Sequence, residues 1–233
     1  MEKKIHLKGR LLAISEYVEN SELTADIGCD HGRLCISLLQ SGRAKRAYAG
    51  DISEPSLRKA RLLCDKCGLQ DRMTIEVSDG LCGLTEQPDT IIIAGMGGLL
   101  ISEILEKGRD KAHAASHLIL QPMRGIAELR RYMHLCGYSI IREKLCEEAG
   151  RIYQIMDVRY CATDGGTIPY NTYDVGEYML KAHDPLLPDY IHRLKCELEQ
   201  ALHGMRSAGT DTSGIMKRLD ALEKISEVYE NEA

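Results

Sequence analysis

The chain has 233 residues with a formal net charge of −5, and 44% of them are hydrophobic and 28% charged. This length is enough for one α/β domain with a small appendage, and the composition excludes a disordered or fibrous chain. The acidic balance argues against a simple basic nucleic-acid binder, although residues 31–50 contain four Lys/Arg and no acid, which is compatible with a local phosphate-binding face.

The residue types that are absent or numerous narrow the class of protein further. Because Phe and Trp are absent, Leu, Ile, Val, Met and Tyr must build the core, and only Tyr, His or Arg could stack on a base. Nine cysteines at scattered spacings, without a signal-peptide pattern, predict reduced thiols in a cytoplasmic protein. No apolar run approaches the roughly 20 residues that a membrane span needs, so no membrane partner is expected. We expect a monomer or weak dimer.

Predicted strands and helices alternate along the first two thirds of the chain. After an amphipathic helix at 8–20, this alternation predicts an α/β fold with a doubly wound parallel sheet, and a closing hairpin adds an antiparallel edge. Ser53 is the expected N-cap of the third helix. The predicted strands are 24–28, 47–52, 72–77, 90–94 and 117–120; the helices are 31–41, 53–67, 97–107 and 126–136; the hairpin strands are 138–145 and 151–161.

The last quarter of the chain has a different pattern. Residues 163–172 are rich in Gly, Pro and Thr, which is typical of a linker. Beyond them, apolar residues recur at spacings of three and four in 191–205 and 215–229, which predicts an antiparallel helical hairpin with a coiled-coil-like seam. The alternative is that these helices pack on the main domain. The expected domains are therefore 1–165 and 174–233.

The most informative motif is DIGCDHG at 26–32, which follows an apolar run and opens a helix. Glycines let the backbone turn sharply and approach a ligand. Asp51 ends the next apolar run at about the 20-residue spacing of dinucleotide-type sites, where a carboxylate can accept hydrogen bonds from a ribose diol. Asp30 stands where the usual glycine pattern has Gly, which favours an S-adenosylmethionine (SAM) site over a nicotinamide site. The alternative for Asp51 is an acid at a helix N-terminus.

Two further motifs follow the third and fourth predicted strands. Asp79 and Gly80 form an Asp-Gly pair whose carboxylate could accept from an adenine amino group or simply make a turn. The segment AGMGG at 94–98 carries three glycines before a helix, so its backbone can come close to a flat ligand. Its position in the chain favours the substrate side of the pocket, and a tight strand-to-helix turn is the alternative.

No metal or covalent nucleophile is expected. Cys64 and Cys67 form a CxxC pair, but no second pair follows at ligand spacing, so two thiols near a helix end are favoured over a metal site. No Ser-His-Asp or Cys-His nucleophile pattern is visible, which disfavours covalent catalysis.

On these motifs the chain resembles the bacterial TrmK family of tRNA (adenine(22)-N1)-methyltransferases. The resemblance implies a class I SAM-dependent methyltransferase domain, which is Rossmann-like, followed by a C-terminal helical coiled-coil hairpin. Arg33 and Met123 depart from the family, which often has an aromatic residue and Asn at these two positions. The matching stretches are 11–15 after Arg10, 25–32 (ADIGCDHG), 78–81 (SDGL), 92–98 (IIAGMGG), 118–122 (LILQP) and 150–155 (GRIYQI).

The resemblance implies SAM as cofactor, tRNA as partner and methyl transfer to N1 of an adenine. Asp30 is the candidate catalytic residue, because a carboxylate can stabilise the adenine as it becomes cationic; its alternative is bonding within its own loop. A class I methyltransferase for a small molecule or protein, and a non-catalytic SAM- or RNA-binding module, remain open. The expected cofactor-binding residues are Asp26, Gly28, Cys29, His31, Gly32, Asp51, Ile52, Asp79, Gly80, Ala94 and Gly95, and the expected substrate-binding residues are Arg10, Met96, Gly97, Gly98, Gln121 and Pro122.

Overall fold

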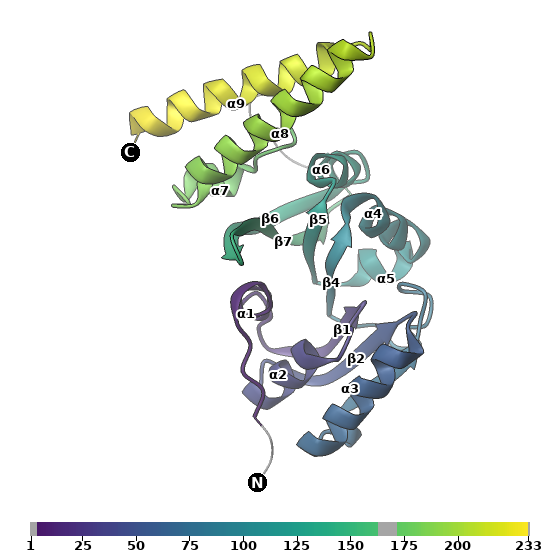
Figure 1. Ribbon diagram of the computed structural model, residues 1–233. Coiled ribbons are helices and arrows are strands. Elements are labelled where there is room, and N and C mark those ends of the chain that lie inside the picture. The colour runs from purple at the N-terminus through teal and green to yellow at the C-terminus, as the bar shows by residue number, and fades with distance from the viewer. Residues whose placement is uncertain (1–3, 163–171, 233) are drawn as a thin grey trace.

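A computed structural model describes residues 4–162 and 172–232, and within them seven strands form one sheet of order β3-β2-β1-β4-β5-β7-β6 (Figure 1). Strand order reverses between β1 and β4, so the predicted doubly wound sheet is confirmed, as is its antiparallel edge. The parallel strands are β1 (Ser21–Ile27), β2 (Ala44–Asp51), β3 (Met73–Val77), β4 (Thr90–Gly97) and β5 (His117–Arg124), and the edge hairpin is β6 (Tyr138–Glu148) and β7 (Arg151–Tyr160).

Helices cover both faces of the sheet and enclose two apolar cores. Side chains alternate between the faces of a strand, so Ile92 of β4 packs in one core while Ile91 and Ile93 pack in the other. The first core lies under α1 (Gly9–Ser15), α2 (Arg33–Ser41) and α3 (Glu54–Cys67), and the second under α4 (Gly98–Lys107), α5 (Arg109–Ala114) and α6 (Ile126–Leu135). A single 3-10 turn, η1 (Gln70–Arg72), precedes β3.

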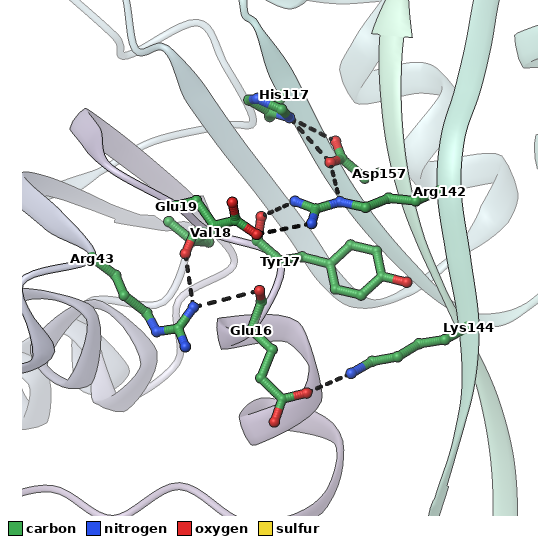
Figure 2. A network of polar contacts seen from close by, with 9 residues as sticks. All are labelled: Glu16, Tyr17, Val18, Glu19, Arg43, His117, Arg142, Lys144 and Asp157. Atoms are coloured by element: carbon green, nitrogen blue, oxygen red, sulfur yellow. Dashed lines mark hydrogen bonds and ion pairs between the residues drawn. The ribbon is translucent and has the colours of Figure 1, made fainter.

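The first helix ends at Ser15, so the prediction that it continues to residue 20 is wrong. The chain leaves the helix through tighter turns, in which the N–H groups of Tyr17 and Val18 each donate to the carbonyl three residues back, and side-chain donors then bind carbonyls beyond the helix end. Arg142 donates to the carbonyl of Tyr17 at 2.7 Å, and Arg43 donates to the carbonyl of Val18 at 3.1 Å (Figure 2). Both arginines are distant in sequence from the helix, so the pattern of apolar residues in the helix could not predict these contacts.

The same arginine joins this segment to the sheet through a fully buried carboxylate. Asp157 of β7 accepts a hydrogen bond from Nε of Arg142 at 2.8 Å and lies 3.0 Å from Nδ1 of His117 (Figure 2). Lys144 pairs with Glu16 at 2.5 Å on the same side. These contacts hold the chain that follows α1 against β5, β6 and β7.

The C-terminal residues form α7 (Glu177–Lys181), α8 (Leu187–Ser207) and α9 (Ser213–Glu232), and Figure 1 shows α8 and α9 side by side above β6, β7 and α6. Leu198, Leu222 and Ile225 bury their side chains in a core that also includes Leu145 of β6. The helices therefore pack both on each other and on the main domain. Ala201, expected in the seam, is exposed. Of the predicted linker, only Thr172 lies among the described residues.

A buried polar network fastens the helical hairpin to the sheet. Arg130 of α6 pairs with Glu143 of β6 and donates to the side-chain oxygen of Gln154 at 2.8 Å. Gln154 is fully buried and lies 2.9 Å from the Tyr190 hydroxyl of α8 while donating to the carbonyl of Asp174 at 3.0 Å. Because buried polar groups must be satisfied together, this network fixes how the hairpin sits on the domain.

The remaining contacts of the hairpin extend this attachment. Arg218 of α9 donates from Nε to Asp174 at 2.9 Å, and Asp184 accepts the backbone N–H of Leu145 at 2.9 Å. The Tyr229 hydroxyl donates to the carbonyl of Asp184 at 3.1 Å.

Across the part of the chain that the structure describes, no helix is both long and apolar enough to cross a membrane.

Candidate active site

The motifs singled out in the sequence meet along one edge of the sheet. Strands β3, β2, β1, β4 and β5 are adjacent and parallel, so their carboxyl ends lie next to one another. Asp79 follows β3, Asp51 ends β2, residues 26–32 span the end of β1, residues 94–98 span the end of β4, and Gln121 lies near the end of β5. Ligands of doubly wound sheets bind at this edge, where the strand order reverses.

The turn after β1 has three residues in the left-handed region, Gly28 at φ +77°, Asp30 at +50° and Gly32 at +65°. The N–H of Gly28 donates to the carbonyl of Gly50 at 2.7 Å, which holds the turn against the end of β2. A Cβ at Gly28 would lie 2.2 Å from Cε of Met96, so the end of that flexible side chain would have to move. The left-handed φ of Gly28, rather than this contact, is the main reason for glycine at this position.

Asp51 organises the backbone on both sides of it. One carboxylate oxygen accepts the N–H of Ser53 at 2.8 Å, and the other accepts the N–H of Asp30 at 3.0 Å. Ser53 is the N-cap of α3, as predicted. The contact with the N–H of Ser53 therefore matches the alternative interpretation of Asp51 as an acid at a helix N-terminus, whereas the contact with Asp30 does not. A carboxylate has about four acceptor positions, so this side chain retains capacity for two hydroxyl donors. Ile52 beside it is 76% exposed.

Asp26 is a buried carboxyl group without a cationic partner among the described residues. Its side chain is 4% exposed overall, and the Cys35 thiol, 3.8 Å away, is its hydrogen-bond donor. The pKa of Asp26 is raised to about 7, chiefly by burial and to a smaller extent by the nearby Asp51 carboxylate, while the Cys35 thiol and the Arg10 guanidinium act in the opposite direction. A carboxyl group in this condition favours a cation from a ligand, because pairing would offset the cost of burying the charge.

Arg10 is held above the end of β4 by a fully buried glutamine. Nη1 of Arg10 donates to the side-chain oxygen of Gln121 at 2.7 Å, and the same oxygen accepts the N–H of Gly95 at 3.0 Å. The amide nitrogen of Gln121 donates to the carbonyl of Pro122 at 2.8 Å. Gln121 therefore has its hydrogen bonds satisfied within the protein and acts on a ligand through Arg10 and Gly95.

A cavity of about 110 Å³ lies between the N-terminal helix and the turn after β1. The buried carboxyl group of Asp26 and the guanidinium group of Arg10, which can carry opposite charges, both line this cavity. The thiol of Cys29 is inert there, because burial raises its pKa well above the usual range. The lining residues are Arg10, Leu11, Asp26, Gly28, Cys29, Asp30, His31, Arg33, Leu34 and Ala94.

The glycine segment after β4 serves two purposes. The strand continues to Gly97 with irregular pairing to β5 at Met96, so the segment is extended where a turn was an alternative. Gly95 has φ +77° and is exposed, which leaves its backbone open to a ligand. Gly98 is buried, and a Cβ there would lie 2.0 Å from the carbonyl oxygen of Gly125, so close packing of α4 on α6 requires this glycine.

The remaining predicted residues lie farther from the cavity or are more exposed. The Asp79 side chain is 77% exposed and lies 3.9 Å from Nζ of Lys107, and Gly80 has φ +62°. Asp30 is 71% exposed and lies 3.4 Å from Nε2 of His31. No hydrogen bond to its own loop from the Asp30 side chain is seen among the described residues.

Candidate metal ligands do not gather anywhere in the described residues, where no group of three His, Cys, Asp or Glu side chains could hold an ion. Cys64 and Cys67 are buried in the last turn of α3. Burial raises the pKa of the Cys64 thiol, which makes it less reactive.

Sequence patterns did not indicate a second, larger cleft of about 540 Å³ that borders the glycine segment. Its lining includes Arg124 at the end of β5 and Arg151 and Tyr153 at the start of β7. The signal in the sequence was that Arg151 and Tyr153 lie within the stretch 150–155 and that Arg124 lies two residues beyond the stretch 118–122.

Comparisons with known proteins agree with this geometry. Residues 7–156 match a family model described as a methyltransferase domain. The chain is 30% identical to the tRNA (adenine(22)-N(1))-methyltransferase of Bacillus subtilis (strain 168), with 98% of this chain and 99% of that protein covered. The crystal structure of the B. subtilis tRNA methyltransferase TrmK is similar with a TM-score of 0.77, 29% identity and coverage of 98% and 99%. A Streptococcus pneumoniae candidate tRNA (m1A22) methyltransferase, solved in complex with S-adenosyl-L-methionine, is similar with a TM-score of 0.82, 27% identity and coverage of 94% and 99%.

Proposed function

The chain belongs to the tRNA (adenine(22)-N1)-methyltransferase family, and from this premise we propose that it transfers a methyl group from SAM to N1 of adenine 22 in tRNA. The observation that carries the proposal is a cavity lined by the buried carboxyl group of Asp26 and by the guanidinium group of Arg10, which Gln121 holds in place. Asp51, the acid expected to bind a ribose, ends the neighbouring strand. A cytoplasmic enzyme acting as a monomer or weak dimer fits a tRNA substrate.

The charged residues of the cavity fit the amino-acid end of SAM. The buried carboxyl of Asp26 lacks a cation among the described residues, so it suits an α-ammonium group. Arg10, held by Gln121, suits the α-carboxylate, although the sequence favoured it as a substrate contact. Asp51 retains acceptors for the two ribose hydroxyls. The exposed Ile52 and Asp79 at neighbouring strand ends suit the adenine ring and its amino group.

SAM supplies the methyl group as part of a sulfonium, which is already activated for transfer. The reaction forms a bond between N1 and the methyl carbon and breaks the bond between that carbon and sulfur, so the electron pair leaves with sulfur. The chain's contribution is to align the three atoms, with the reacting pair about 3–3.5 Å apart. We assign this alignment to the backbone at Gly95, which is exposed, and at Gly97, which is half-buried. Neutral N1 needs no general base, and Asp30 would stabilise the cationic adenine.

The test is methyl transfer from labelled SAM to unmodified bulk tRNA, followed by nucleoside analysis and mapping of the modified position. We expect 1-methyladenosine at position 22 and none in a tRNA with guanosine there. Confirmed SAM binding without transfer to any tRNA would contradict the proposal and favour a small-molecule or protein substrate.

A further inference from the structure

The cleft of about 540 Å³ separates the methyltransferase domain from the helical hairpin. One wall is the chain that leaves β5 and enters α6, the second is the start of β7, and the third is α8. Figure 1 shows α8 and α9 lying over this end of the domain. The cleft is therefore formed only when the hairpin is docked.

This cleft continues from the active-site edge without a break in the sheet. Met96 pairs with Pro122, and Gly97 pairs with Arg124, so the glycine segment of β4 lies directly beside the cleft wall. A Cβ on Gly97 would lie 3.6 Å from Nε of Arg124. A polymer whose reacting base lies at Gly95–Gly97 would thus have its neighbouring residues in reach of the cleft.

Three guanidinium groups from three elements converge on it with unused donors. Arg124 and Arg151 are exposed, and neither makes a hydrogen bond or ion pair with any described residue. Arg193 of α8 donates from Nη1 to the carbonyl of Gly150 at 2.6 Å. The other N–H groups of this guanidinium make no hydrogen bond with any described residue. Guanidinium groups bind phosphate oxygens through paired N–H donors.

The rest of the lining favours a nucleotide over a bare anion. Two tyrosines line the cleft, in a chain that has no Phe or Trp for stacking. Tyr190 is buried, whereas Tyr153 is half-buried and so has part of its side chain available to a base. Glu128 and Glu197 also line the cleft, and their carboxylates can accept from the amino groups of a base edge. Arg218 is already neutralised by Asp174 and forms part of the fixed floor.

We propose that this cleft binds the tRNA strand next to the target adenosine, with Arg124, Arg151 and Arg193 on the phosphates and Tyr153 stacked on a base. The proposal rests on the proposed function, which it deepens by assigning a second contact to the same substrate. It gives the overall acidic chain a local phosphate site where the substrate enters.

The experiment compares Arg124→Gln, Arg151→Gln and their double variant with the wild type and with Arg159→Gln. Arg159 is the matched control because it lies near the other end of β7 from Arg151, is exposed and has no side-chain partner among the described residues. We expect tRNA affinity to fall about tenfold for each cleft variant, and the slope of log affinity against log salt to fall by about one per arginine removed. SAM affinity should stay unchanged, and Tyr153→Leu should weaken tRNA binding by about tenfold with no change in the salt slope.

Each outcome separates this proposal from the proposed function. If the wild type methylates tRNA and the cleft variants bind tRNA as tightly as Arg159→Gln, the cleft proposal is overturned and the methylation proposal stands. If the wild type transfers no methyl group but binds tRNA with an affinity that the cleft variants lose, the cleft proposal stands alone. If the wild type neither methylates nor binds tRNA, both are overturned.

Discussion

Asp51 combines two duties in one side chain. It ties the turn after β1 to the start of α3 through the backbone N–H groups of Asp30 and Ser53, and its remaining acceptors face the ligand edge. The loop geometry and the proposed ribose contact therefore depend on the same carboxylate, and a substitution there affects both.

Replacing Asp51 with alanine should weaken SAM binding by about tenfold to a hundredfold, because hydrogen bonds to a charged acceptor contribute roughly 1.5–3 kcal/mol. Calorimetric titration of SAM measures the change. Ser53→Ala is the control, because it removes only the cap on the N–H of Ser56 and should lower stability by about 0.5–2 kcal/mol with SAM affinity unchanged. Wild-type affinity in Asp51→Ala would sink the ribose assignment.

Asp26 makes stability and SAM binding respond to pH in opposite directions. Its pKa is about 7 in the folded chain, whereas an unfolded aspartate titrates near 4. Between about pH 4 and pH 7 the folded state binds the additional proton, so unfolding free energy falls as pH rises through this window and then levels off. SAM affinity should instead rise as pH passes about 7, because only the ionised carboxylate pairs with an ammonium group.

Asp26→Asn should remove both slopes. Urea unfolding across this pH window measures the first slope, and calorimetric SAM titration at several pH values measures the second. Cys35→Ala is the comparison variant: it keeps the carboxyl group and removes the thiol that lowers the pKa of Asp26, so both slopes should persist and move to higher pH. An Asp26→Asn variant whose SAM affinity still rose across neutral pH would show that another group carries the dependence.

At the scale of elements, local patterns predicted what depends on neighbours in sequence. Apolar runs located all five parallel strands, and Ser53 located the start of α3. The short helices α5 and α7 were missed, because six and five residues are too few for a helical period to emerge. The end of α1 was wrong because the chain turns more tightly at Tyr17 and Val18, a conformation held by a contact from Arg142, which lies 125 residues beyond Tyr17.

The candidate site divides in the same way. Strand-end residues such as Asp26 and Asp51 were predictable, since parallel strands end at one edge of the sheet. The coupling of Arg10 to Gln121 was not, because those side chains are 111 residues apart and nothing local distinguishes a buried glutamine from an exposed one. Their selection as site residues came from the family resemblance, and only the fold supplies their arrangement.

The polar network under the hairpin should be among the most sensitive points of the fold. Arg130→Met leaves the buried Glu143 carboxylate without its cation, which should lower the free energy of unfolding by about 3–5 kcal/mol. Arg131→Met, on the exposed side of the same helix, should change it by less than about 0.5 kcal/mol. Chemical denaturation compares the two, and equal losses would mean that the network adds nothing.

At the scale of the whole molecule, the hairpin belongs to the substrate side. Deleting residues from 174 onward should preserve SAM binding, because the cavity that contains Asp26 has no lining residue from the hairpin. The deletion should abolish efficient tRNA methylation, because it removes one wall of the cleft. It also uncovers Leu145 and removes Asp174 and Tyr190, two of the partners of Gln154, so a lower melting temperature is expected.

SAM titration, methyl-transfer assays and thermal unfolding of the truncated and full-length chains test this together. The full-length Arg159→Gln variant serves as the reference for an intact cleft. Full tRNA methylation by the truncated chain would make the hairpin dispensable and would contradict its assignment to the substrate.

The buried attachment of the hairpin fixes how far its tip lies from the methyltransferase domain. Helix α8 has 21 residues, which at 1.5 Å per residue is a length of about 30 Å. Because Tyr190, Asp174 and Gln154 lock one end of this arm to the sheet, its far tip stands at a set distance from the methyl-transfer pocket. Helix length, and not loop flexibility, then determines how far the tip of the hairpin lies from the cleft at its base. Inserting one heptad into both α8 and α9 would extend that span by about 10 Å and leave the pocket chemistry untouched.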